Sequence, residues 1–111
     1  MAKTKSGFDI SLSVDTYDIL QEKISNKSKY VSALISDFLL SEKKDLITSY
    51  VKRQNKKRIS FTIDIQLYNS FNEYMDNYIK ENPYTYSNKS VLIENLIRED
   101  MQKRFDINFI K

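Results

Sequence analysis

The chain has 111 residues and a mass of 13.2 kDa, enough for one compact domain but not for two independent ones. Its single glycine, Gly7, and single proline, Pro83, favour long helices with short connections over a fold with many turns. The absence of cysteine and histidine excludes disulfides, thiolate or imidazole metal sites, and nucleophilic catalysis by either residue. We therefore expect a mainly α protein that is not an enzyme and binds no metal or cofactor.

The excess of positive charge lies in the first half of the chain. Residues 1–57 contain 11 lysines and arginines and 7 acidic residues, whereas residues 58–111 contain 7 and 8. Two short basic runs, at residues 3–5 and 52–58, are typical of a surface that binds a polyanion, although a solvated charged surface has the same composition. No segment has the apolar length of a signal peptide or a membrane span, so we expect a soluble cytoplasmic protein without a membrane partner.

Two segments, residues 8–14 and 58–63, alternate between apolar and polar side chains. A period of two predicts half-buried strands, and aligning Ile10 with Ile59 places the two strands 49 residues apart. The apolar face consists of Phe8, Ile10, Leu12, Val14, Ile59, Phe61 and Ile63. The outward polar face consists of Asp9, Ser11, Ser13, Arg58, Ser60 and Thr62. We therefore expect each strand to turn one face to the core and the other to solvent.

Each strand is followed by the pattern of an amphipathic helix. Asp15 and Asp64 stand where an acidic side chain can cap the helix that follows. The apolar stripes of the two helices are Tyr17, Leu20 and Ile24 in the first, and Leu67, Phe71, Tyr74, Met75 and Tyr78 in the second. The second helix is predicted to stop at Pro83, because proline cannot continue a helix.

The tetrapeptide Ser-Asn-Lys-Ser occurs twice, at residues 25–28 and 87–90. Each copy precedes apolar residues spaced for one face of a helix. Asn26 and Asn88 are placed to cap these helices with their side-chain oxygens. A strand followed by two helices is therefore repeated in the chain.

The repeat divides the chain into two copies of one unit. The first copy covers residues 1–40 and the second covers residues 58–104. Between them, residues 41–57 form a basic linker that either contains a further helix or prolongs the preceding one. Residues 105–111 form an apolar C-terminal tail.

This duplicated unit resembles the ribbon-helix-helix family of DNA-binding regulators, in which a strand and two helices per copy dimerise through an antiparallel two-stranded ribbon. The resemblance covers residues 8–40 and 58–104, and the tandem arrangement is similar to regulators carried by archaeal filamentous viruses. It implies a mainly α fold with a two-stranded antiparallel β-ribbon, double-stranded DNA as the partner, and transcription regulation by a viral or plasmid type of regulator or repressor. A copy of about forty residues is too small to bury its own core, so we expect the two copies to share one. The strands pair either within one chain or between chains, and we favour pairing within the chain because the basic linker is long enough to return.

A two-stranded ribbon fits the DNA major groove, where its outward side chains meet the base edges. The predicted base-reading residues are Asp9, Ser11, Ser13, Arg58, Ser60 and Thr62. Arg58 is the strongest of them, because a guanidinium pairs with guanine O6 and N7. The 49-residue alignment places Asp9 at the equivalent position, where it either accepts from a cytosine amino group or is repelled by the DNA backbone. Ordinary solvent-facing strand residues are the alternative interpretation.

The starts of the two second helices form a separate predicted phosphate site, since unpaired backbone N–H groups and the helix dipole attract anions there. Together with the basic runs, the predicted phosphate-binding residues are Lys3, Lys5, Asn26, Lys27, Ser28, Lys56, Lys57, Asn88, Lys89 and Ser90. Phosphate contacts position a protein on DNA, and contacts to base edges specify the sequence. Plain capping by asparagine is the alternative for the helix starts.

The C-terminal tail has no place in the repeated unit, and an exposed apolar segment usually marks a contact with another protein. Its predicted oligomer or partner contacts are Phe105, Ile107, Phe109 and Ile110. The alternative function is therefore an antitoxin-like or scaffold protein that binds another protein through this tail. We also expect a homo-oligomer.

Overall fold

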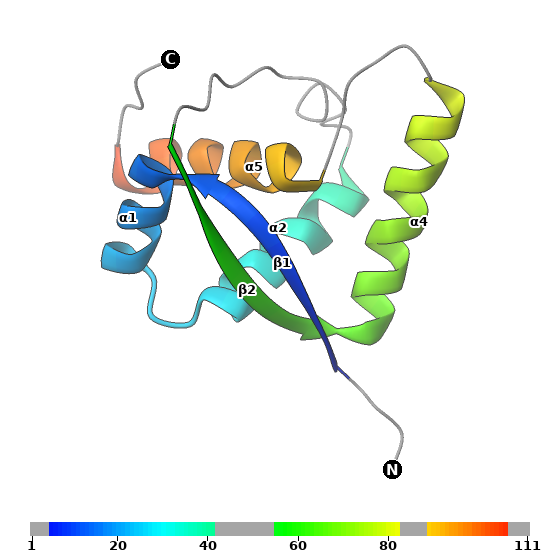
Figure 1. Cartoon of the computed structure of the whole chain (residues 1–111), viewed down its shortest axis with the longest axis horizontal. Helices are drawn as coiled ribbons and strands as arrows, with labels where there is room; N and C mark the ends of the chain where they lie inside the picture. The colour runs from blue at the N-terminus through cyan, green and yellow to red at the C-terminus, as the bar shows by residue number, and fades with distance from the viewer. Residues whose placement is uncertain (1–4, 42–54, 83–88, 107–111) are drawn as a thin grey trace.

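The computed structural model describes residues 5–41, 55–82 and 89–106, and these residues form two strands and four helices (Figure 1). In chain order the elements are β1 (Lys5–Ser13), α1 (Val14–Lys23), α2 (Lys27–Leu40), β2 (Lys56–Asp64), α4 (Ile65–Glu81) and α5 (Lys89–Phe105). The prediction of a mainly α protein with one β-ribbon is confirmed. The two predictions for the linker fall mostly on residues 42–54, outside the described residues, whereas its last two residues begin β2.

β1 and β2 form the ribbon, and both belong to the same chain. They pair antiparallel over nine residues each, with Phe8 opposite Phe61 and Ile10 opposite Ile59. Because side chains alternate along a strand, these apolar residues share one face, which the helices cover. In Figure 1 the ribbon runs diagonally across the molecule, with α1 at one end and α4 at the other.

One hydrophobic core lies between the ribbon and the helices. α2 packs mainly against β2, and α5 packs mainly against β1, so the second helix of each copy contacts the strand of the other copy. The buried core residues are Ile10, Leu12, Leu20, Val31, Ile35, Phe38, Ile59, Phe61, Ile63, Phe71, Met75, Leu92, Ile93, Leu96, Ile97 and Met101. The two copies therefore share one core, as their small size requires.

The two strands correspond at a spacing of 51 residues, and the predicted spacing of 49 is wrong. Both strands are nine residues long and both pass directly into the next helix, so their first and last residues fix the alignment. A shift of two residues keeps every side chain on the same face of a strand, so apolar alternation alone cannot distinguish the two spacings. At the observed spacing Asp9 corresponds to Ser60, and Arg58 corresponds to Gly7 rather than to Asp9.

The helix starts agree with two of the predicted caps and differ from a third. Asn26 Oδ1 accepts from a backbone N–H of the first turn of α2 at 3.1 Å, and Asp64 Oδ2 accepts from two such groups of α4 at 3.0 and 3.2 Å. Asp15 does not cap α1, because that helix begins one residue earlier and includes Asp15 in its first turn. Val14 is correspondingly the first residue of α1 and not the last residue of the strand face.

Candidate nucleic-acid interface

The solvent side of the ribbon consists of five rows, each with one residue from β1 and one from β2. From one end to the other, the rows are Lys5 and Asp64, Gly7 and Thr62, Asp9 and Ser60, Ser11 and Arg58, and Ser13 and Lys56. Eight of these ten residues are exposed, Ser11 is half-buried and Ser13 is buried. This surface, called the ribbon face below, is polar or charged wherever it carries an exposed side chain.

All six predicted base-reading residues therefore lie in the rows of the ribbon face, but the predicted exposure of Ser13 to solvent is wrong. Ser13 is only 5% exposed, because β1 ends there and its backbone N–H donates to Glu94 of α5 at 3.0 Å. The last row consequently presents Lys56 alone. The basic end of the ribbon face is formed by Lys56 and Arg58, two residues apart on β2.

The centre of the ribbon face carries an acceptor. The hydroxyl of Ser60 donates to Asp9 Oδ1 directly across the ribbon. The hydroxyl proton is thereby directed at the carboxylate, and the remaining lone pairs of Asp9 can only accept. No hydrogen bond or ion pair joins Arg58 to another residue in the described ranges, so its guanidinium is exposed with its donors available for a ligand.

Lys57 lies opposite Leu12 and does not belong to the ribbon face. Its ammonium group stands 5.0 Å from the centre of the Tyr17 ring, within the range of a cation–π interaction. Lys5 is exposed at the opposite end of the ribbon, across from Asp64. The predicted phosphate contacts of β1 and β2 are thus distributed over both ends of the ribbon and one flank.

Ser28 and Ser90 attach the second helices to the ribbon. The backbone N–H of Thr62 donates to Ser28 Oγ at 3.0 Å, and the backbone N–H of Ser11 donates to Ser90 Oγ at 3.2 Å. The two bonds are equivalent in the repeat, and each joins a helix of one copy to the strand of the other. The first turns of α2 and α5 therefore lie beside the ribbon, one against each strand.

The predicted phosphate role of the helix starts is compatible with this arrangement and is not tested by it. Lys27 and Lys89 are half-buried first residues of their helices. The ammonium group of Lys27 donates to the carbonyl of Ile24 at 3.2 Å. Attachment of the helix starts by serine was not predicted, although the recurrence of serine in both copies marks the two positions.

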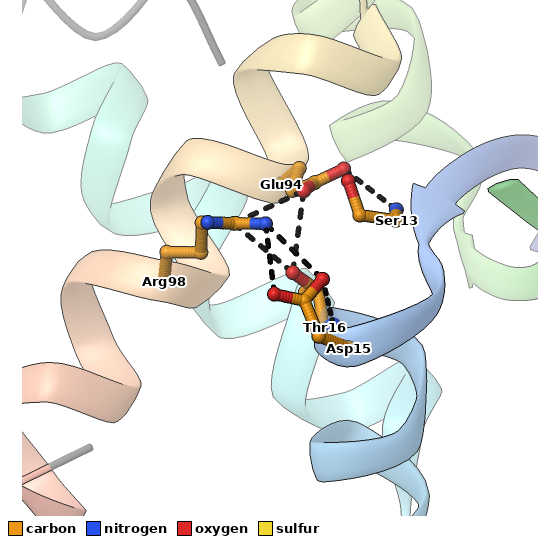
Figure 2. Close-up of polar contacts among 5 residues, drawn as sticks. All are labelled: Ser13, Asp15, Thr16, Glu94 and Arg98. Carbon is orange, nitrogen blue, oxygen red and sulfur yellow. Dashed lines mark hydrogen bonds and ion pairs between the residues drawn. The ribbon is translucent and has the colours of Figure 1, made fainter. Parts of the chain in front are cut away.

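A buried network connects α5 to the junction of β1 and α1 (Figure 2). Glu94 is fully buried, and its carboxylate accepts from the Ser13 N–H at 3.0 Å and from the Thr16 hydroxyl at 3.2 Å. Arg98, one turn further along α5, pairs with Glu94 at 3.0 Å and with Asp15 at 3.3 Å. The side chain of Ser13 does not cap α1, and Glu94 of the other copy holds the residue before this helix through its backbone N–H.

This network was not predicted from the sequence. Glu94 and Arg98 are four residues apart and resemble any solvated ion pair on a helix surface. Their burial depends on α5 packing against β1 and α1, which is a contact between residues about eighty positions apart.

A second polar contact joins α2 to α5. The Tyr30 hydroxyl donates to Asp100 Oδ2 at 2.5 Å, and Arg104 pairs with the other oxygen of Asp100 at 3.5 Å. Burial raises the pKa of Tyr30 well above its usual value, and the hydrogen bond to Asp100 adds to the shift. Tyr30 therefore remains a neutral donor, and the contact fixes how the two helices cross beneath the ribbon.

The remaining site predictions fall mostly outside the described residues. These are Lys3, Asn88, Ile107, Phe109 and Ile110. Phe105 is the last residue of α5 and is 37% exposed. The Lys23 ammonium group lies 5.8 Å from its ring centre, so part of this ring packs against α1.

Comparison with known proteins gives no relative, since no protein-family model, curated protein or solved structure matches the chain. Among the described residues, no helix combines the length and the apolar character needed to cross a membrane. In the same ranges, no three acidic side chains come together as a metal site requires.

Proposed function

We propose that the protein is a sequence-specific double-stranded DNA-binding transcriptional regulator that inserts its ribbon face into the major groove. The observation that carries the proposal is the ribbon face itself, which is a polar surface on an antiparallel strand pair with an exposed arginine. The major groove accommodates a two-stranded ribbon, and each base pair presents a distinct set of donors and acceptors there. A ribbon with polar side chains at successive rows is suited to read that set.

The chemistry of the ribbon face matches base edges better than it matches phosphates alone. The guanidinium of Arg58 can donate twice to guanine, and the carboxylate of Asp9 can accept from a cytosine amino group. A carboxylate at the centre of a surface that binds only phosphates would weaken binding, because both partners are anionic. Thr62 adds a hydroxyl and a methyl group, and a methyl group can contact thymine.

The helix starts supply the complementary phosphate contacts in this proposal. The first turns of α2 and α5 are attached to opposite strands by Ser28 and Ser90. Backbone N–H groups at a helix start attract anions. With the ribbon in a groove, these turns flank it on both sides, which is where the two phosphate backbones run.

The experiment is selection of duplexes bound by the full chain from a random pool, followed by binding measurements at increasing salt. We expect an enriched sequence, and a slope of log K against log salt of roughly −5 for about six phosphate contacts. Lys56→Ala should make this slope shallower by about one. The matched control is Lys80→Ala, because Lys80 is an exposed lysine in the last turn of α4, about 22 Å along that helix from its start at the ribbon.

Two results would contradict the proposal. One is a pool without any enriched sequence, and the other is a salt slope shallower than about −2, which corresponds to very few phosphate contacts.

A further inference from the structure

The ribbon face lacks the two-fold symmetry that the backbone of the ribbon has. At the spacing of 51 residues, the central row pairs the equivalent residues Asp9 and Ser60. The two-fold axis of the backbone passes through this row and relates the row on one side of it to the row on the other side. One of these rows contains Gly7 and Thr62, and the other contains Ser11 and Arg58. One side of the centre therefore carries an arginine, whereas the equivalent position on the other side has no side chain.

Charge increases this difference between the two ends. Beyond the arginine row lies Lys56, whose partner in the last row is buried. Beyond the glycine row lies Lys5 opposite Asp64, and these two formal charges cancel. One end of the ribbon face is therefore cationic, the centre is anionic, and the other end is neutral.

Gly7 is not required by the backbone. Its φ angle is not positive, so the conformation is open to any residue. A Cβ atom at Gly7 would meet only the carbonyl oxygen of Phe61, at an ordinary contact distance of 3.7 Å. The bare position is consequently a property of the ribbon face and not a condition for folding.

The buried network makes this unsymmetrical ribbon the preferred one (Figure 2). If the second copies of two chains paired with each other, Glu94 would meet the residues equivalent to Ser13 and Thr16, which are Asp64 and Leu67. The backbone N–H would remain at the position of Ser13, but the buried carboxylate would then face another carboxylate, and the hydroxyl donor of Thr16 would be replaced by an apolar side chain. A symmetrical ribbon with two arginine rows is therefore disfavoured.

We propose, as an extension of the proposed function, that the protein recognises a duplex site without dyad symmetry and binds it in a single orientation. Arg58 contacts a guanine on one side of the site, and Asp9 accepts from a cytosine amino group at its centre. On the other side, Gly7 offers no side chain, so only the short side chain of Thr62 can reach the bases. The recognition sequence then has a direction, which a symmetrical dimer cannot read.

The test begins with the preferred duplex of the full chain and two palindromes, each built by repeating one half of that duplex. We expect the palindrome of the Gly7 half to bind on the order of 10- to 100-fold more weakly, because it lacks the guanine for Arg58. The palindrome of the Arg58 half should bind about as well as the preferred duplex. Equal binding of both palindromes would overturn the inference.

The second part of the test places an arginine at the position equivalent to Arg58. Gly7→Arg should create a preference of about tenfold or more for guanine on the Gly7 side of the site, so that the Arg58-half palindrome becomes the best ligand. Gly7→Ala is the matched control and should leave the order of the three duplexes unchanged. If Gly7→Arg gains no preference for the palindrome although Gly7→Ala binds normally, the assignment of Gly7 to the bare side is wrong.

Orientation is read directly with a DNA-cleaving reagent attached to Lys5→Cys, since the chain contains no cysteine of its own. We expect cleavage at one end of the preferred duplex only. Equal cleavage at both ends would overturn the inference while leaving the proposed function intact. Failure to enrich any duplex in the selection would contradict the proposed function instead, so the two failures are distinguishable.

Discussion

Arg58 is the side chain whose replacement separates base reading from general attraction to DNA. It is exposed on the ribbon face, beside Lys56 of the same strand. We expect Arg58→Ala to relax the preference at particular base pairs by about 1 to 3 kcal/mol, because a bidentate contact to guanine is lost. Lys56→Ala should weaken all duplexes alike. Binding of each variant to the preferred duplex and to its single-base mismatches measures the difference.

A uniform loss of affinity in Arg58→Ala, with the pattern of mismatch effects unchanged, would make Arg58 a phosphate contact. Lys57 is a less suitable control than Lys56, because its position over the Tyr17 ring gives its replacement an effect on packing as well as on charge.

Tyr30 gives a prediction for the alkaline range. Burial and Asp100 raise its pKa in the folded protein, whereas an unfolded tyrosine ionises near pH 10. The stabilisation from protonated Tyr30 is therefore complete below about pH 10 and is lost as the pH rises above it, because only the unfolded chain releases the proton. We expect the free energy of unfolding to exceed that of Tyr30→Phe by about 1 kcal/mol at neutral pH.

This difference should shrink and then reverse in sign as the pH passes through about 10 to 11. Chemical denaturation of both proteins at several pH values measures it. A difference that is constant from neutral to alkaline pH would show that the hydroxyl of Tyr30 ionises equally in the folded and unfolded states.

At the scale of the elements, the two junctions between a strand and its following helix are held differently. Asp64 of β2 caps α4, whereas α1 has no side-chain cap, and Glu94 of α5 instead holds Ser13 and Thr16 at that junction. We expect Glu94→Gln to lower the free energy of unfolding by about 3 kcal/mol, since it leaves Arg98 without its buried partner. Urea denaturation measures the change.

The matched control for Glu94 is Asp64→Ala, which removes an exposed cap and should cost about 1 kcal/mol. Double replacement of Glu94 and Arg98 by residues of similar shape should recover part of the loss, because no buried charge is then left alone. A loss in Glu94→Gln no larger than that in Asp64→Ala would show that the buried ion pair contributes no more than an exposed cap.

The elements that depend on local pattern were predictable from the sequence. The alternation of Ile59, Phe61 and Ile63 specified the buried face of β2, and Asn26 specified the start of α2. The spacing of the strands was not predictable, because a period of two fits 49 and 51 equally well. Only the residue at which each strand ends and the helix begins distinguishes the two spacings, and local sequence specifies strand ends weakly.

The polar residues of the site also include some whose positions were predictable from local sequence and some whose positions were not. The outward positions of Arg58, Ser60 and Thr62 follow from alternation, and the structure confirms them. The burial of Ser13 and of Glu94 follows from contacts between distant segments, which no local pattern contains. Sequence reasoning therefore found the surface of the ribbon and missed the interior contacts that determine which of its residues are exposed.

At the scale of the whole molecule, one chain provides both strands of the ribbon and both pairs of helices that cover it. The connection between the copies makes pairing of β1 with β2 an intramolecular event, with a high effective concentration. Ribbon formation therefore needs no second chain, and any homo-oligomer must use another surface. The fixed partnership of two unlike strands is also what gives the ribbon face its direction.

This intrachain pairing is tested with cysteines placed across the central row, as Asp9→Cys together with Ser60→Cys. Residues directly opposite in an antiparallel pair have Cα atoms about 4.5 to 5.5 Å apart, within the range that a disulfide spans. The chain has no other cysteine, so oxidation can form only this bond or bonds between chains. We expect a monomer on a denaturing gel without reductant, at every protein concentration, because the two cysteines belong to one chain.

Each single variant, Asp9→Cys or Ser60→Cys, is the control and should form covalent dimers only slowly and in proportion to concentration. Rapid dimer formation by the double variant would mean that the ribbon joins two chains, and rapid dimer formation by Ser60→Cys alone would mean that two second copies pair with each other.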